Sequence, residues 1–157
     1  MITAALAWAL MPGVPLACGV DGAAAHVAEL AGAPRGTADF LRVVAWQESR
    51  CRPGAVGDAG RAVGAFQMHR AAAGGRGPEP LRRARAAARG VRVFGAWVAA
   101  AYVVRLRAYI GRTCDGPVTW DAVRRAWRRP SLACDDGPEA RAVNRRFRHA
   151  KNRTRHG

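Results

Sequence analysis

Apolar and polar positions recur along most of this chain with the period of an α-helix. Phe40, Leu41 and Val44 stand three or four residues apart, and Glu48 continues the same face at its C-terminal end. Burial of this apolar stripe would carry Glu48 towards the interior. The pattern therefore predicts a helix that begins near Thr37, whose hydroxyl we expect to cap it.

A longer helical run covers residues 81–110, and Gly111 is placed to end it with a left-handed cap. Its centre, residues 91–104, is apolar on nearly every side, which is typical of a buried central helix. This apolar stretch is flanked by Arg and is too short to cross a bilayer. We therefore expect no transmembrane span.

Two further helices are expected towards the C-terminus. Thr119 is a cap for residues 120–129, which a proline halts, and Pro138 suits the first turn of a last helix through Phe147. Residues 141–157 form a basic C-terminal helix and tail, with seven Arg or Lys and no acid. Such a tail is most often a solvated, frayed end, and binding is its second interpretation.

A glycine-rich segment separates the first helix from the long one. Pro53 ends the helix, and glycines follow at positions 54, 57, 60 and 64. Glycine accepts backbone angles that other residues resist, so this segment suits a short hairpin or a loop. Any strand of the protein should lie here. The sequence thus predicts a mainly α fold with a short glycine-rich hairpin or loop.

Chain length and net charge limit the number of domains and the kinds of binding partner that the protein can have. The chain has 157 residues, enough for one domain, and its net charge of +15 comes from 26 Lys plus Arg against 11 Asp plus Glu. A surface this positive attracts polyanions, among which nucleic acid, an anionic membrane and bacterial cell wall all qualify. We see no helix-turn-helix, zinc-finger or aromatic RNA-binding motif, so we expect no specific nucleic-acid partner.

Cysteine and histidine usage bears on metals and on the compartment. The four cysteines lack the close spacing of a zinc site and the four histidines are scattered, so we expect no metal. Cys114 and Cys134 bracket one short helical segment and could clip its ends together, which would imply an oxidising environment. Cys51 is either disulfide-bonded or a buried free thiol.

The N-terminal segment, residues 1–17, is apolar and uncharged, and it is a candidate signal peptide. Its neutral start and Pro15 weaken that interpretation, and the alternatives are that it lies on the fold or that translation starts at Met11. Residues 18–140 would then form the main domain.

Glu48 is the strongest candidate for chemistry. A carboxyl at the end of a buried apolar face, beside a loop that can widen into a cleft, has a raised pKa because burial penalises its charged form. Such a group stays protonated near neutral pH and can protonate a glycosidic oxygen. The alternative is a surface Glu48 that pairs with one of the many Arg side chains.

Two firm motifs and one degraded motif carry a resemblance to a known family. Glu48-Ser49, then Pro-Gly-Ala-Val-Gly at 53–57, and then Gly-Ala-Phe-Gln-Met at 64–68 resemble the lysozyme-like lytic transglycosylases of the soluble lytic transglycosylase type. The family's third motif, usually Ala-Tyr-Asn followed by Gly-Pro, would fall on residues 126–130. There Trp127 replaces the Tyr and Arg128 replaces the Asn.

The resemblance implies a lysozyme-like fold and peptidoglycan glycan strands as the substrate, with no cofactor. Glu48 would act first as the acid and then as the base, and would yield 1,6-anhydro products. Ser49 would shape the helix end, and Trp127 would stack on sugar. Three residues would line the cleft near the acid: Phe66, Gln67 and Met68. Their ordinary alternatives are a capping Ser, core apolar side chains and a buried amide.

Two other functions stay open. Asp58 follows Glu48 in the glycine-rich segment, and across a cleft it could position water for hydrolysis as in a lysozyme, although an Asp in such a turn more often satisfies backbone groups. A non-catalytic, basic wall-binding or nucleic-acid-binding protein is the other. We expect an exported or virion-associated monomer, of the size of accessory enzymes in secretion, conjugation and phage assemblies.

Overall fold

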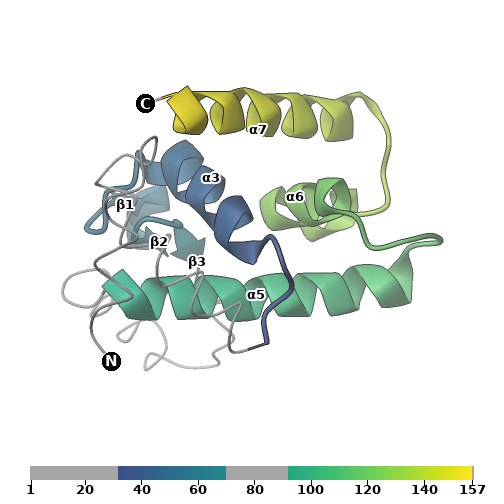
Figure 1. Cartoon of the computed structure of the whole chain (residues 1–157), viewed down its shortest axis with the longest axis horizontal. Helices are drawn as coiled ribbons and strands as arrows, with labels where there is room; N and C mark the ends of the chain where they lie inside the picture. The colour runs from purple at the N-terminus through teal and green to yellow at the C-terminus, as the bar shows by residue number, and fades with distance from the viewer. Residues whose placement is uncertain (1–31, 70–91, 157) are drawn as a thin grey trace.

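The computed structural model describes residues 32–69 and 92–156, and within them the chain is mainly helical, as predicted (Figure 1). The α-helices are α3 (Thr37–Ser49), α5 (Arg92–Thr113), α6 (Trp120–Arg128) and α7 (Pro138–His156). Two short 3-10 helices, η1 (Asp58–Gly60) and η2 (Pro130–Leu132), accompany them. The candidate signal peptide, residues 1–17, and the expected helical residues 81–91 lie outside the described ranges.

The helices pack in layers around a small core. In Figure 1, α5 runs along one side of α3 and α6, and α7 lies across their other side. Small residues on the buried face of α5, such as Ala96, Ala99 and Ala100, allow close approach to its neighbours. On the opposite side, the Phe40 ring stacks on Phe147 of α7 with centroids 5.4 Å apart. Residues distant in sequence thus hold α3 between two helical layers.

A three-stranded antiparallel sheet forms where the glycine-rich hairpin was expected. Its strands are β1 (Val56–Gly57), β2 (Ala62–Val63) and β3 (Met68–His69), in the order β1-β2-β3. Gly60, with a φ of 86°, closes the turn between β1 and β2. The sheet lies beside the C-terminal end of α3 (Figure 1), and this places it next to Glu48.

Two predicted helix ends were wrong. Thr37 does not cap α3 through its hydroxyl: Gly36 occupies the N-cap position with a φ of 90°, and the Thr37 hydroxyl donates to the Pro34 carbonyl instead. Helix α5 continues past Gly111 to Thr113, because the Cys114 N–H still donates to the Ile110 carbonyl at 2.9 Å. The predicted Thr119 cap is confirmed, since its side chain accepts from the Ala122 N–H at 3.2 Å.

The basic tail is not frayed over its length. Helix α7 extends to His156 because an apolar stripe, hidden among the charges, continues along one face. Ala140, Phe147 and Ala150 are buried on that face at helical spacing. The tail is therefore part of the packed fold as far as Ala150, and Arg side chains between these apolar residues, such as Arg145 and Arg148, are exposed.

A disulfide joins Cys114, after α5, to Cys134, after η2, with Cα atoms 5.3 Å apart. This confirms the expected clip. Cys51 is buried and also disulfide-bonded, so the free-thiol interpretation was wrong. Among the residues described, no helix is long and apolar enough to cross a membrane. The same residues contain no cluster of three His, Cys, Asp or Glu that could hold a metal ion.

Candidate active site

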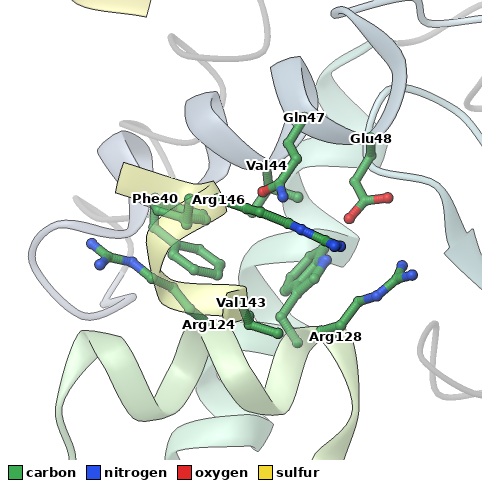
Figure 2. Close-up of a pocket in the computed structure, with 10 residues that line it drawn as sticks. Phe40, Val44, Gln47, Glu48, Arg124, Arg128, Val143 and Arg146 are labelled. Carbon is green, nitrogen blue, oxygen red and sulfur yellow. The ribbon is translucent and has the colours of Figure 1, made fainter. Parts of the chain in front are cut away.

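Glu48 lies one residue before the end of α3 and is half-buried. Leu41 and Val44, on the same helix, are buried in the core, so their packing fixes the rotation of α3 and directs Glu48 inward. In Figure 2 the Glu48 carboxylate points towards the Arg128 side chain, which comes from the end of α6. The candidate acid thus occupies the position that the apolar stripe predicted.

The surroundings of Glu48 favour its protonated form. Burial raises the pKa of Glu48 above its ordinary value, while the positive charges of Arg128 and, less strongly, His69 act to lower it. Burial is the largest of these effects, so the net shift is upward. Glu48 can therefore hold a proton at a pH where a solvated Glu has lost it.

A cavity of about 430 Å³ opens beside Glu48, and we call it the Glu48 cavity. Helix α3, the sheet region and α6 all contribute to its wall. Its lining residues are Glu48, Asp58, Ala62, Gln67, His69, Trp127 and Arg128. Four of the residues singled out in the sequence, Glu48, Asp58, Gln67 and Trp127, are thus brought together.

Ser49 is buried and links the end of α3 to the segment that precedes Gln67. Its hydroxyl donates to the Ala65 carbonyl at 2.8 Å and lies 3.1 Å from the Ala45 carbonyl. The same oxygen accepts from the Arg52 N–H at 3.1 Å. Ser49 therefore shapes the helix end, as predicted, and holds two walls of the site together.

Gln67 is held in place by its own amide. Its Nε2 donates to the carbonyls of Gly64 at 2.9 Å and Ala55 at 3.2 Å. A Cβ atom at position 57 would lie 2.3 Å from the Gln67 Oε1, so any larger residue there would displace the amide from this position. The amide thus enters the Glu48 cavity with a fixed orientation.

Phe66 and Met68 do not line the Glu48 cavity. Both are buried in the hydrophobic core, 3% and 5% exposed, and only Gln67 between them faces the cavity. The prediction that both line the cleft near the acid was wrong, because the turn at residues 64–67, in which Gln67 has a φ of 45°, directs Gln67 to the cavity while Phe66 and Met68 pack in the core. Their ordinary interpretation as core residues holds.

Asp58 lies in the turn after β1, and its carboxylate pairs with side chains rather than with backbone groups of that turn. Its carboxylate pairs with Arg61 of the same turn at 2.8 Å, and its second oxygen lies 3.4 Å from the His69 Nε2. It also lines the Glu48 cavity. His69 was missed in the sequence, since a lone His after Met68 carries no signal until the antiparallel pairing of β2 and β3 places it beside this turn.

Trp127 lies on α6 between the acid and the core. Its ring packs edge-on against Phe40, with centroids 5.6 Å apart, and against Tyr102 at 5.2 Å. Because these contacts fix the indole, it offers a rigid apolar surface to the Glu48 cavity.

A second cavity of about 180 Å³ adjoins the first and shares Glu48, Trp127 and Arg128 with it (Figure 2). We call it the arginine pocket. Its lining residues are Phe40, Val44, Gln47, Glu48, Arg124, Trp127, Arg128, Val143, Arg146 and Phe147. This pocket could not be predicted from the sequence, because Arg146 reaches it only through the packing of α7 on α3 and α6.

Comparison with known proteins finds no matching family model, no matching curated protein and no matching solved structure. The function of this site therefore has to be inferred from its own geometry and chemistry.

Proposed function

We propose that this protein is a lytic transglycosylase that cleaves peptidoglycan between N-acetylmuramic acid and N-acetylglucosamine, with Glu48 as its single catalytic acid. The observation that carries the proposal is a half-buried Glu48, with a raised pKa, in the wall of an open cavity. A protonated carboxyl at such a position is what the departure of a glycosidic oxygen requires. The arrangement of helices around a small antiparallel sheet supports a lysozyme-like fold.

The reaction needs one carboxyl used twice. Glu48 gives its proton to the glycosidic oxygen while the bond from that oxygen to C1 of the muramic acid breaks. The acetamido group of the substrate stabilises the positive charge that develops at C1. The C6 hydroxyl then bonds to C1, and its proton passes to the Glu48 carboxylate. The products are a free sugar hydroxyl and a 1,6-anhydro ring, and Glu48 is again protonated.

Three neighbours of Glu48 have roles that their contacts support. Gln67 presents a fixed amide that can bond sugar hydroxyl or acetamido groups. Trp127 offers a flat apolar face for stacking on a sugar ring. Arg128 lowers the pKa of Glu48 and so opposes the effect of burial. Because Arg128 favours the ionised form, Glu48 can be present as the carboxylate that the second step requires.

The test is cleavage of purified peptidoglycan by the protein and by two matched variants. Glu48→Gln removes the acid with little change in shape, and we expect it to abolish product formation. Glu139→Gln makes the same chemical change at an exposed position on α7, and we expect it to leave activity unchanged. Equal activity of Glu48→Gln and the unmutated protein would refute the assignment of the acid.

A second function, hydrolysis, is favoured by one observation: Asp58 and His69 pair with each other and share the cavity with Glu48. His69, oriented by Asp58, could take a proton from water that attacks C1. Digestion in ¹⁸O-labelled water separates the two reactions. Hydrolysis places one labelled oxygen at each new reducing end, and Asp58→Asn should then abolish that product. Anhydro products carry no label.

We further propose that the protein acts outside the cytoplasm, in the periplasm, outside the cell or in a virion. The disulfide between Cys114 and Cys134 is compatible with an oxidising compartment. The net charge of +15 would hold the protein on anionic wall polymers, and salt should weaken that hold.

A further inference from the structure

The arginine pocket places guanidinium groups and an apolar wall directly beside the candidate acid. Arg124, Arg128 and Arg146 line it together with the rings of Phe40, Trp127 and other apolar side chains (Figure 2). Glu48 is shared with the neighbouring Glu48 cavity. A side branch of a ligand bound at Glu48 can therefore occupy this pocket.

The three arginines are not equivalent. Arg124 is already neutralised, because its Nη1 lies 2.6 Å from the Asp121 carboxylate, and its guanidinium packs 4.3 Å from the centre of the Phe147 ring. Arg128 lies towards Glu48, and its positive charge lowers the pKa of that carboxyl.

The Arg146 side chain makes no ion pair or hydrogen bond within the described part of the chain. Figure 2 shows this side chain extending from α7 towards the side of the pocket where Glu48 and Arg128 lie. Arg146 therefore presents an unpaired positive charge to a ligand in the pocket.

The size and charge of the pocket limit what it can bind. A volume of about 180 Å³ is below the roughly 300–1,000 Å³ of sites that enclose a whole small molecule, so the pocket suits a branch of a larger ligand. In a strand that carries its stems, the lactyl carboxyl of muramic acid is tied up in the amide that begins the stem, so the sugars themselves offer Arg146 no carboxylate. A carboxylate pairs with guanidinium by strong, charge-assisted hydrogen bonds.

We propose that the arginine pocket binds a carboxylate of the peptide stem that muramic acid carries, so that the enzyme prefers stem-bearing strands to bare glycan. The inference rests on the proposed function. The stem starts at the lactyl ether of the same sugar whose C1 lies at Glu48, and so it branches off beside the acid. The aliphatic parts of the stem lie against the apolar wall made by Phe40, Val44 and Val143, and Arg146 pairs with the carboxylate.

The test measures binding of matched glycan fragments to Glu48→Gln protein, which cannot turn them over. A peptidoglycan tetrasaccharide with its stems is compared by calorimetry with the same tetrasaccharide after an amidase has removed the stems and the lactyl carboxylates so exposed have been converted to amides. We expect the stems to improve the affinity about tenfold, as one charge-assisted pair contributes. Stems whose carboxylates are amidated should lose that advantage.

Arg146→Gln, added to this background, should abolish the preference for stems. Arg145→Gln is the matched control, since Arg145 is exposed on the same helix and does not line the pocket. Equal affinity for the two fragments, or a preference that survives Arg146→Gln, would overturn the inference. Displacement of the stem-bearing fragment by a short oligonucleotide, dependent on Arg146, would assign the pocket to phosphate instead.

Failure of this inference is distinguishable from failure of the proposed function. If the enzyme cleaves both kinds of strand at the same rate, and Arg146→Gln is as active as the unmutated protein, the transglycosylase proposal stands and the proposed stem pocket is refuted. If a folded protein cleaves neither strand, the proposed transglycosylase activity is refuted. The binding measurement then shows separately whether the arginine pocket binds the stem.

Discussion

Ser49→Ala tests whether one buried hydroxyl joins the two walls of the site. Ser49 is 4% exposed, and its hydroxyl donates to the Ala65 carbonyl at 2.8 Å. The Ala45 carbonyl, which also lies near the Ser49 hydroxyl, keeps a second donor in the Cys51 N–H at 3.0 Å. The Ala65 carbonyl is therefore the group that loses its donor in the variant. Leaving a buried polar group unpaired costs about 1–3 kcal/mol.

Two smaller effects also contribute to the balance. The Arg52 N–H retains a contact of 3.4 Å to the Ser49 carbonyl and belongs to an exposed residue, so the loss of its bond to the hydroxyl costs little. Ala is a better helix former than Ser by about 0.5 kcal/mol, which offsets part of the cost. The net loss in the free energy of unfolding should be about 1.5 kcal/mol. For a chain of 157 residues this lowers the Tm by about 3–6 °C.

The assay is thermal unfolding followed by circular dichroism, with Thr113→Ala as the control. The Thr113 hydroxyl makes the same kind of bond, to the Tyr109 carbonyl at 2.9 Å, but at an exposed position. Its removal should change the free energy of unfolding by less than about 0.5 kcal/mol. If Ser49→Ala is no more destabilising than Thr113→Ala, the Ser49 hydroxyl does not hold the site together.

Three more predictions concern charge and the disulfide. Because the folded-state pKa of Glu48 is raised, its charge costs stability as the pH rises through that pKa, so urea unfolding should show Glu48→Gln more stable than the unmutated protein at about pH 7 and equal at about pH 4. Arg128→Gln removes an influence that lowers the pKa of Glu48, and the alkaline limb of the rate profile should move to higher pH. Replacing both Cys114 and Cys134 by Ser should lower the free energy of unfolding by about 3 kcal/mol, measured by calorimetry, because the disulfide closes a sequence separation of 20 residues.

Each of these has a contrary result. A stability difference between Glu48→Gln and the unmutated protein that is the same at both pH values would mean that ionisation of Glu48 costs nothing. A rate profile that moves to lower pH in Arg128→Gln would contradict the sign of its effect on Glu48. An unchanged unfolding transition without the disulfide would show that the clip does not stabilise the fold.

Local patterns in the sequence predicted the elements that depend on neighbouring residues. The stripe of Phe40, Leu41 and Val44 placed α3 and directed Glu48 inward, since helical periodicity alone decides which residues share a face. The spacing of the glycines predicted where the small sheet lies, and Thr119 predicted the start of α6. These signals lie within a few residues of the structure that they specify.

The rest of the site depends on packing between distant segments. Arg146 enters the site only because Ala140, Phe147 and Ala150 bury one face of α7, and the surrounding charges concealed that stripe. His69 reaches Asp58 through strand pairing. No local pattern specifies either contact.

The most direct test of the central claim is mass spectrometry of the muropeptides released from purified peptidoglycan by the unmutated protein and by Glu48→Gln. We expect 1,6-anhydro-muropeptides from the unmutated protein and none from Glu48→Gln. Release of no muropeptide by a properly folded protein, or release of the same products by Glu48→Gln, would contradict it.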